Sequence, residues 1–169
     1  YTESFNVPFM IRYPDKIRPR VDSTLLSTID IMPTLLSMAG LEAKIPESAE
    51  GRDLSPVLLE NGKDCDIPDC ALYIRNVNGP KDEDGNVRGF FPVARGIKTD
   101  RYTFEVAITR NGTLKEIIIF DDLKDPYQLN KIDYRSCPEL LQQLVTMLKE
   151  KLAEANDIWH REGTLDKLN

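Results

Sequence analysis

The sequence has 169 residues, of which 41% are hydrophobic and 30% are charged, and this composition is ordinary for a globular protein. The formal net charge of -6 argues against nucleic acid as a partner, because binding to a phosphate backbone requires clustered Lys and Arg. The sequence also predicts no membrane span, since it contains no apolar run near the roughly 18–20 residues that cross a bilayer.

The first sixty residues show the pattern strand, helix, loop and short helix. Residues 7–13 are a short apolar run that predicts a strand buried on both faces, as in a parallel sheet. Apolar positions at helical spacing predict a helix that starts at Asp30 with an irregular first turn and stops at Gly40. Asp53 can cap a short helix over 54–59. This order is typical of the end of an α/β sheet, and a strand with two apolar faces needs neighbours that this chain does not supply.

The chain then changes to short strands separated by turns. Residues 71–77, 91–98 and 101–109 are strand candidates, and Asn111-Gly112 precedes an apolar run at 117–120. The Asn-Gly pair predicts a two-residue hairpin turn with both residues at positive φ. The result is an expected antiparallel sheet of four strands.

The last large element is an amphipathic helix. Ser136 to Glu139 has the spacing of a capping box with a proline in the first turn. Trp159 is expected to pack near the end of the helix, and the residues from Arg161 onward are expected to fray. Leucines at four-residue spacing give the helix an apolar side that should cover one face of the sheet; they are Leu140, Leu144, Leu148 and Leu152.

The three cysteines give no complete disulfide framework, because their number is odd. Cys65 and Cys70 are close enough in sequence to form a bridge in an oxidising compartment, while Cys137 stands apart. A zinc site is not favoured, because His160 is the only histidine and zinc ligands usually occur as two matched clusters.

Four stretches, in the same order, resemble the motifs of formylglycine-dependent sulfatases. The family strings are Y-E-E-S-x-R-V-P-x-I-I-R-x-P, then S-x-x-D-L-x-P-T-L-L-x-L-A-G, then G-x-S-L-x-P-L-L, and last R-x-x-R-T-x-R-Y-K followed by L-Y-D-L-x-x-D-P-x-E-x-x-N. The matching segments here are 1–14, 27–40, 51–58, and 95–102 with 120–130.

The resemblance implies an alkaline phosphatase-like fold, in which a large α/β domain precedes a smaller domain. It predicts that residues 1–62 form the end of the large α/β domain, with its terminal strand and helices. Residues 63–169 would form the C-terminal α+β subdomain, a four-stranded antiparallel sheet packed with an amphipathic helix. The reading from the residues alone gives the same order of elements.

The resemblance also implies a mechanism. In this family the nucleophile is a formylglycine made from Cys or Ser in a C/S-x-P-x-R string, and calcium or a similar divalent ion neutralises the sulfate oxygens. No such string occurs here, and neither does the family's Asp-His-Gly or Asp-Asn-Gly metal segment. The expectation is therefore that the catalytic part lies upstream in a parent sulfatase, that this chain alone is inactive, and that the substrate is a sulfated small molecule or glycan. A periplasmic, secreted or lysosomal location is implied by the family.

Two positions depart from the family pattern. Thr103 replaces the Lys of Y-K, which removes a charge that could face the substrate. Gln128 replaces the Glu of D-P-x-E, which is expected only to loosen a turn.

The loop over 74–90 is the best candidate for contact with the substrate, since the small domain of this family lies beside the active-site mouth. Arg75, Asn76, Lys81 and Arg88 offer hydrogen-bond donors to sulfate, carboxylate or hydroxyl groups, and Arg95 follows on the next strand. The alternative is a solvated polar loop, with Arg95 paired to a local carboxylate.

Two other functions remain open from the sequence. A related phosphodiesterase or phosphotransferase of the same superfamily would use an unmodified Thr or Ser upstream. A stand-alone carbohydrate-binding module would need a self-contained core, which the predicted buried strand at 7–13 argues against.

Overall fold

The computed structural model describes residues 2–60, 67–76, 93–109 and 111–168. The chain divides into two compact units, Glu3–Ala71 and Leu72–Asn169, the second of which also includes the first two residues. Among the described residues no helix is both long enough and apolar enough to cross a membrane.

The unit Glu3–Ala71 is built from short helices. A 3-10 turn, η1 (Thr28–Asp30), leads directly into α2 (Ile31–Met38), which confirms the predicted irregular first turn. The helix ends at Met38, two residues before Gly40, whose φ is +70°, as is common just beyond the end of a helix. The predicted short helix is α3 (Ser55–Glu60), and the Asp53 carboxylate caps it by accepting from the Ser55 amide at 2.8 Å. The remaining short helices are α1 (Thr2–Phe5) and η2 (Glu42–Lys44).

The predicted buried strand at residues 7–13 is wrong in this structure. The segment has no regular secondary structure, and Val7 and Met10 are 63% and 92% exposed. A strand requires a neighbour that takes up its backbone hydrogen bonds and covers its faces, and no described strand lies beside this segment. The apolar residues of this segment are suited to burial, but a strand also needs a neighbouring strand, and none is found among the described residues.

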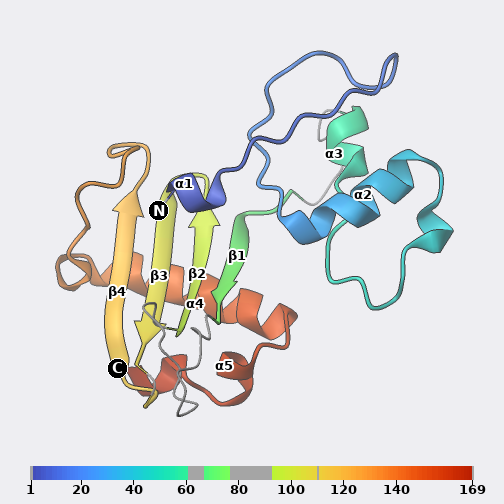
Figure 1. Cartoon of the computed structure of the whole chain (residues 1–169). Coiled ribbons are helices and arrows are strands. Elements are labelled where there is room, and N and C mark those ends of the chain that lie inside the picture. Colours follow the sequence, from blue (N-terminus) through green and yellow to red (C-terminus); the bar gives the residue numbers. More distant parts are fainter. Residues whose placement is uncertain (1, 61–66, 77–92, 110, 169) are drawn as a thin grey trace, which may run out of the picture. The chain divides into compact units, whose positions relative to one another are not determined.

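The unit Leu72–Asn169 contains most of the predicted sheet. The strands are β1 (Cys70–Arg75), β2 (Val93–Thr99), β3 (Tyr102–Ile108) and β4 (Leu114–Asp121). They lie in the order β1-β2-β3-β4, and neighbouring strands run in opposite directions (Figure 1). This confirms the four-stranded antiparallel sheet.

The β3–β4 hairpin differs in detail from the prediction. The Thr109 amide donates to the Thr113 carbonyl at 2.8 Å, and the Gly112 amide donates to the Thr109 carbonyl at 3.0 Å. Three residues therefore separate the closing pair, and the predicted two-residue turn is wrong. Gly112 has a φ of +75°, as expected for the left-handed residue of a three-residue hairpin loop.

Helix α4 (Pro138–Glu154) covers one face of the sheet (Figure 1). Ile97, Phe104 and Ile119 are paired across three strands and are completely buried. Three of the four predicted leucines are buried as well, so apolar sheet and apolar helix face each other. The buried leucines are Leu144, Leu148 and Leu152.

The start of α4 is not the predicted capping box. Cys137 stands at the N-cap, and Pro138 is the first helical residue. Ser136 belongs instead to a preceding 3-10 turn, η3 (Tyr134–Ser136), where its hydroxyl donates to the Asp133 carbonyl at 2.7 Å. The serine is thus used by the turn before the helix and cannot also cap it.

The end of the chain is more ordered than predicted. Helix α5 (Ile158–Arg161) and a 3-10 turn, η4 (Leu165–Leu168), follow α4. Trp159 is buried, as predicted, but Leu165 is also buried, so the expected fraying from Arg161 is wrong. Leu165, which belongs to no helical repeat in the sequence, is the buried residue that holds this last segment against the rest of the unit.

Candidate functional site

The strand-end residues Arg75 and Asn76 were predicted to contact the substrate, and the structure places their side chains in different clusters. The Arg75 guanidinium donates to Glu105 Oε1 at 2.7 Å. Asn76 Oδ1 instead accepts from Arg95 Nη1 at 2.8 Å. The two neighbours therefore do not form one site, because consecutive side chains of an extended strand point to opposite faces.

The Arg75 cluster is centred on a buried carboxylate. Glu105 accepts from Arg75 and, through its other oxygen, from the Tyr73 hydroxyl at 2.7 Å. Burial and the neighbouring Glu105 raise the pKa of Tyr73 well above its usual value. Gly96, which is paired with Glu105, leaves room for the Tyr73 ring, since a Cβ there would lie 2.3 Å from it. The arrangement is a structural support for Arg75.

Arg95 lies at the centre of the second cluster, and only 1% of the residue is exposed. Its Nε lies 3.1 Å from both carboxylate oxygens of Asp157, and its Nη2 lies 3.0 Å from Oδ2. The guanidinium carbon is 5.0 Å from the centroid of the Trp159 ring, within the range of a cation–π interaction. The alternative reading of Arg95, pairing with a carboxylate, is therefore what the structure shows.

Several sequence candidates fall outside the described residues. Lys81 and Arg88 lie there, as does most of the predicted 74–90 loop. Cys65 also lies outside, so the possible Cys65–Cys70 bridge is not described.

The two departures from the sulfatase pattern are in direct contact. Gln128 Nε2 donates to Thr103 Oγ1 at 3.0 Å and to Asp122 Oδ1 at 2.6 Å. Thr103 in turn donates to Asp122 Oδ2 at 2.7 Å, and Lys98 pairs with the same oxygen at 2.9 Å. Thr103 and Gln128 are each only 3% exposed, so both side chains lie within this buried network.

Gln128 has a φ of +53°, a conformation uncommon outside glycine, and its buried amide fixes the turn. Thr103 and Gln128 are thus joined by a hydrogen bond between two neutral side chains.

The S-x-x-D…P-T and G-x-S-L motifs also contact each other. Asp30 accepts from the Ser27 amide and from the Arg52 amide, each at 2.8 Å. The Thr34 hydroxyl accepts from the Leu54 amide at 2.9 Å. These strings therefore fasten residues 51–54 to the start of α2. The contacts explain the motif residues as structural.

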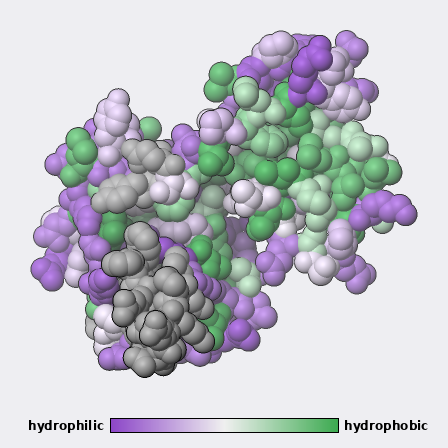
Figure 2. Space-filling model, in the orientation of Figure 1, coloured by the Kyte–Doolittle hydropathy of each residue, from purple (hydrophilic) through white to green (hydrophobic). Residues whose placement is uncertain are grey.

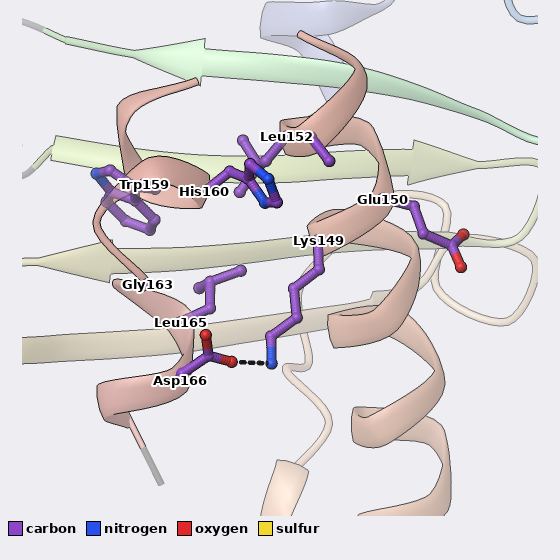
Figure 3. A pocket seen from close by; sticks show the side chains of 9 residues that line it. Lys149, Glu150, Leu152, Trp159, His160, Gly163, Leu165 and Asp166 are labelled. Atoms are coloured by element: carbon purple, nitrogen blue, oxygen red, sulfur yellow. Dashed lines mark hydrogen bonds and ion pairs between the residues drawn. The ribbon is translucent and has the colours of Figure 1, made fainter. Parts of the chain in front are cut away.

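A cavity of about 320 Å³ lies between α4 and the segment that follows α5 (Figure 3). Trp159, His160 and Leu165 are among its lining residues. Lys149 of α4 forms an ion pair with Asp166 beside the cavity, and this hydrogen bond lowers the pKa of Asp166. No Ser, Thr or Cys lines the cavity, so it offers no hydroxyl or thiol nucleophile.

The cofactors implied by the resemblance do not fit the residues of this chain. The sequence lacks the C/S-x-P-x-R string from which formylglycine is made. Within the described ranges no group of three or more His, Cys, Asp or Glu side chains is arranged to hold a metal ion. The sequence therefore lacks the formylglycine string, and the described residues provide no grouped set of metal ligands.

Comparison with known proteins gives consistent matches. The sequence model of the family described as N-sulphoglucosamine sulphohydrolase, C-terminal, matches residues 1–157. An endo-4-O-sulfatase from Bacteroides thetaiotaomicron is 45% identical over 98% of this chain and 33% of its own length. An ulvan-active sulfatase from Formosa agariphila is 33% identical over 100% of this chain and 31% of its own length.

A solved structure supports the same relationship. It comes from work on the metabolism of glycosaminoglycans by Bacteroides thetaiotaomicron, is 43% identical, and superposes with a TM-score of 0.83. The match covers 92% of this chain and 32% of that one. The chain thus spans about a third of the length of the relatives that it matches.

Proposed function

Because this chain belongs to the N-sulphoglucosamine sulphohydrolase, C-terminal family, we propose that it is the non-catalytic C-terminal part of a sulfatase that hydrolyses sulfate esters of glycans. The observation that carries the proposal is the family match over residues 1–157 in a sequence that lacks the nucleophile string. In the parent enzyme, formylglycine and calcium or a similar divalent ion would be held by residues that precede these.

The exposed apolar surface of the Glu3–Ala71 unit supports the proposal that a further part of the parent enzyme packs against this unit. Ile29, Met32 and Leu35 are 56%, 42% and 43% exposed on successive turns of η1 and α2. Figure 2 shows hydrophobic residues gathered over this part of the surface. Extended apolar patches usually mark an interface, and we infer that the upstream catalytic part of the same polypeptide covers this one.

The substrate side of the proposal rests on the relatives. One is named an endo-4-O-sulfatase and another an ulvan-active sulfatase, and the matched structure comes from work on the metabolism of glycosaminoglycans. We propose Asn76 as a described residue that contacts such a substrate; it is exposed and directly follows the last residue of β1. Arg75 is a second candidate, on the other face of the strand.

The experiment compares the 169-residue chain with the full-length parent. Release of sulfate from 4-nitrophenyl sulfate and from sulfated glycosaminoglycan disaccharides should require the parent, and the chain alone should release none. Mass spectrometry of the parent should find an aldehyde at a Cys or Ser of a C/S-x-P-x-R string. Hydrolysis of phosphodiesters with an unmodified Thr or Ser nucleophile would favour the related phosphodiesterase, and turnover by the chain alone would overturn the placement of the active site.

A further inference from the structure

We propose that Arg95 is a positioning residue that turns the Asn76 amide so that its NH₂ group, and not its oxygen, faces an anionic group of the substrate, a sulfate or a carboxylate. The inference rests on the proposed function and adds to it a residue and a chemical preference. It depends on contacts among Asn76, Arg95, Asp157 and Trp159, all within the Leu72–Asn169 unit.

The first step is that Arg95 is held from several sides. Asp157 accepts from both Nε and Nη2, and the Ala94 carbonyl accepts from Nη1 at 3.0 Å. Asp157 is itself fixed, because its carboxylate caps α5 by accepting from the Trp159 amide at 2.8 Å. A guanidinium held by a helix cap and an aromatic ring at once has little freedom to rotate.

The second step is the orientation of the amide. A guanidinium can only donate hydrogen bonds, so the atom of Asn76 that faces Arg95 Nη1 at 2.8 Å must be the oxygen. The Asn76 NH₂ group is therefore turned away from Arg95. No acceptor for it is found among the described residues, and the residue is exposed.

The third step is the chemistry of the ligand. A side chain whose NH₂ group faces outward, with its oxygen turned toward a guanidinium, favours ligand oxygen atoms that only accept, such as those of sulfate and carboxylate groups. An asparagine with a free amide could turn over and accept from a hydroxyl or an ammonium group. Arg95 removes this freedom, and this is how a residue with almost no exposed surface would influence specificity.

Asn76→Asp in the full-length parent tests the inference. The carboxylate still accepts from Arg95, so the temperature of unfolding should stay within a few degrees of the wild type. It has lost both donors and adds a negative charge that repels the substrate. We expect the KM for a sulfated glycosaminoglycan disaccharide to rise about tenfold or more, while kcat changes by less than about threefold.

Two further variants make the result specific. Asn111→Asp makes the same change at an exposed position in the β3–β4 hairpin and should leave KM unchanged. Arg95→Lys keeps a positive charge beside Asp157 but lacks the planar fork, so it should raise KM through Asn76 even if the fold is retained.

The outcomes separate the two proposals. A wild-type parent that hydrolyses neither the disaccharide nor 4-nitrophenyl sulfate overturns the proposed function and this inference with it. A wild type that is active, with an Asn76→Asp variant whose KM equals that of the wild type, overturns this inference alone. A rise in KM that Asn111→Asp reproduces would also overturn it, because the effect would then be one of net charge.

Discussion

Replacing Gln128 by glutamate tests the buried turn network most directly, since the side chain keeps almost the same shape and only its donor is lost. The amide nitrogen lies 2.6 Å from Asp122 Oδ1 and 3.0 Å from Thr103 Oγ1. In the Gln128→Glu variant an acceptor oxygen would occupy this place. Two carboxylates would then face each other where a hydrogen bond had been.

The magnitude follows from the distances. Two ionised carboxylates about 3 Å apart repel by about 5 kcal/mol at an effective dielectric constant of about 20. Protonation limits the cost, because neutralising a carboxyl of ordinary pKa about 4.3 at about pH 7 costs about 3.7 kcal/mol. Lys98, 2.9 Å from the other oxygen of Asp122, offsets part of it. We expect unfolding at about pH 7 to require about 2–4 kcal/mol less free energy.

The dependence on pH identifies the cause. The neighbouring Asp122 should raise the pKa of the introduced carboxyl group in the folded state above its unfolded value. The penalty is then absent below the unfolded pKa and grows as the pH rises toward the folded pKa. The loss of stability should therefore be much smaller at about pH 4.5 than at about pH 7.

The assay is urea unfolding followed by the fluorescence of Trp159, the single tryptophan, which is buried in the same unit. Gln143→Glu makes the same change at an exposed position of α4 and should shift stability by less than about 0.5 kcal/mol. Adding Thr103→Lys to Gln128→Glu should recover at least half of the loss at neutral pH. An equal loss at both pH values, or no recovery, would refute the reasoning.

Three further predictions concern stability. Gly51→Ala would place a Cβ 2.0 Å from the Ile29 carbonyl oxygen, so amide hydrogen exchange in residues 51–54 should accelerate at least about tenfold. Leu148→Ala removes a fully buried side chain and should cost about 2–5 kcal/mol in urea unfolding. Hydrogen bonding to Arg101 lowers the pKa of Asp121. The ion pair therefore stabilises the fold fully above the ordinary pKa of 3.8, and this stabilisation is lost as the pH falls below that value. Asp121→Asn should accordingly reduce the fall of the urea midpoint in acid.

Each of these predictions has a matched control at an exposed position nearby. Glu50→Ala, Gln143→Ala and Asp100→Asn make comparable changes where the side chain is in solvent. Glu50→Ala should leave the hydrogen exchange of residues 51–54 unchanged. Gln143→Ala and Asp100→Asn should change the free energy of unfolding by less than about 0.5 kcal/mol. A control that behaves like its partner would show that burial and pairing are not the cause.

The elements that could be predicted from the sequence are those whose cause is local. The leucine spacing of α4 and the turn residues between β3 and β4 act over a few positions, and both elements were found. The strand at 7–13 failed for the opposite reason. Apolar residues indicate that a segment can be buried, but the burial depends on a partner elsewhere in the chain.

The site was less predictable because its contacts are far apart in sequence. Asp157 lies 62 residues after Arg95, and Thr103 lies 25 residues before Gln128. Nothing in the neighbourhood of either residue signals its partner. The motif comparison marks residues 103 and 128 as unusual, but only the structure shows that their side chains form a hydrogen bond with each other.

The position of Asp157 has a practical consequence for anyone shortening this protein. A version that stopped at Glu154, the last residue of the long helix, would keep the whole sheet and every leucine of the helix. It would nevertheless leave a guanidinium enclosed without its counter-ion, and removal of one partner from such a buried pair typically costs about 3–5 kcal/mol. The short segment beyond the helix, which resembles a dispensable tail in length, therefore behaves as part of the folding unit.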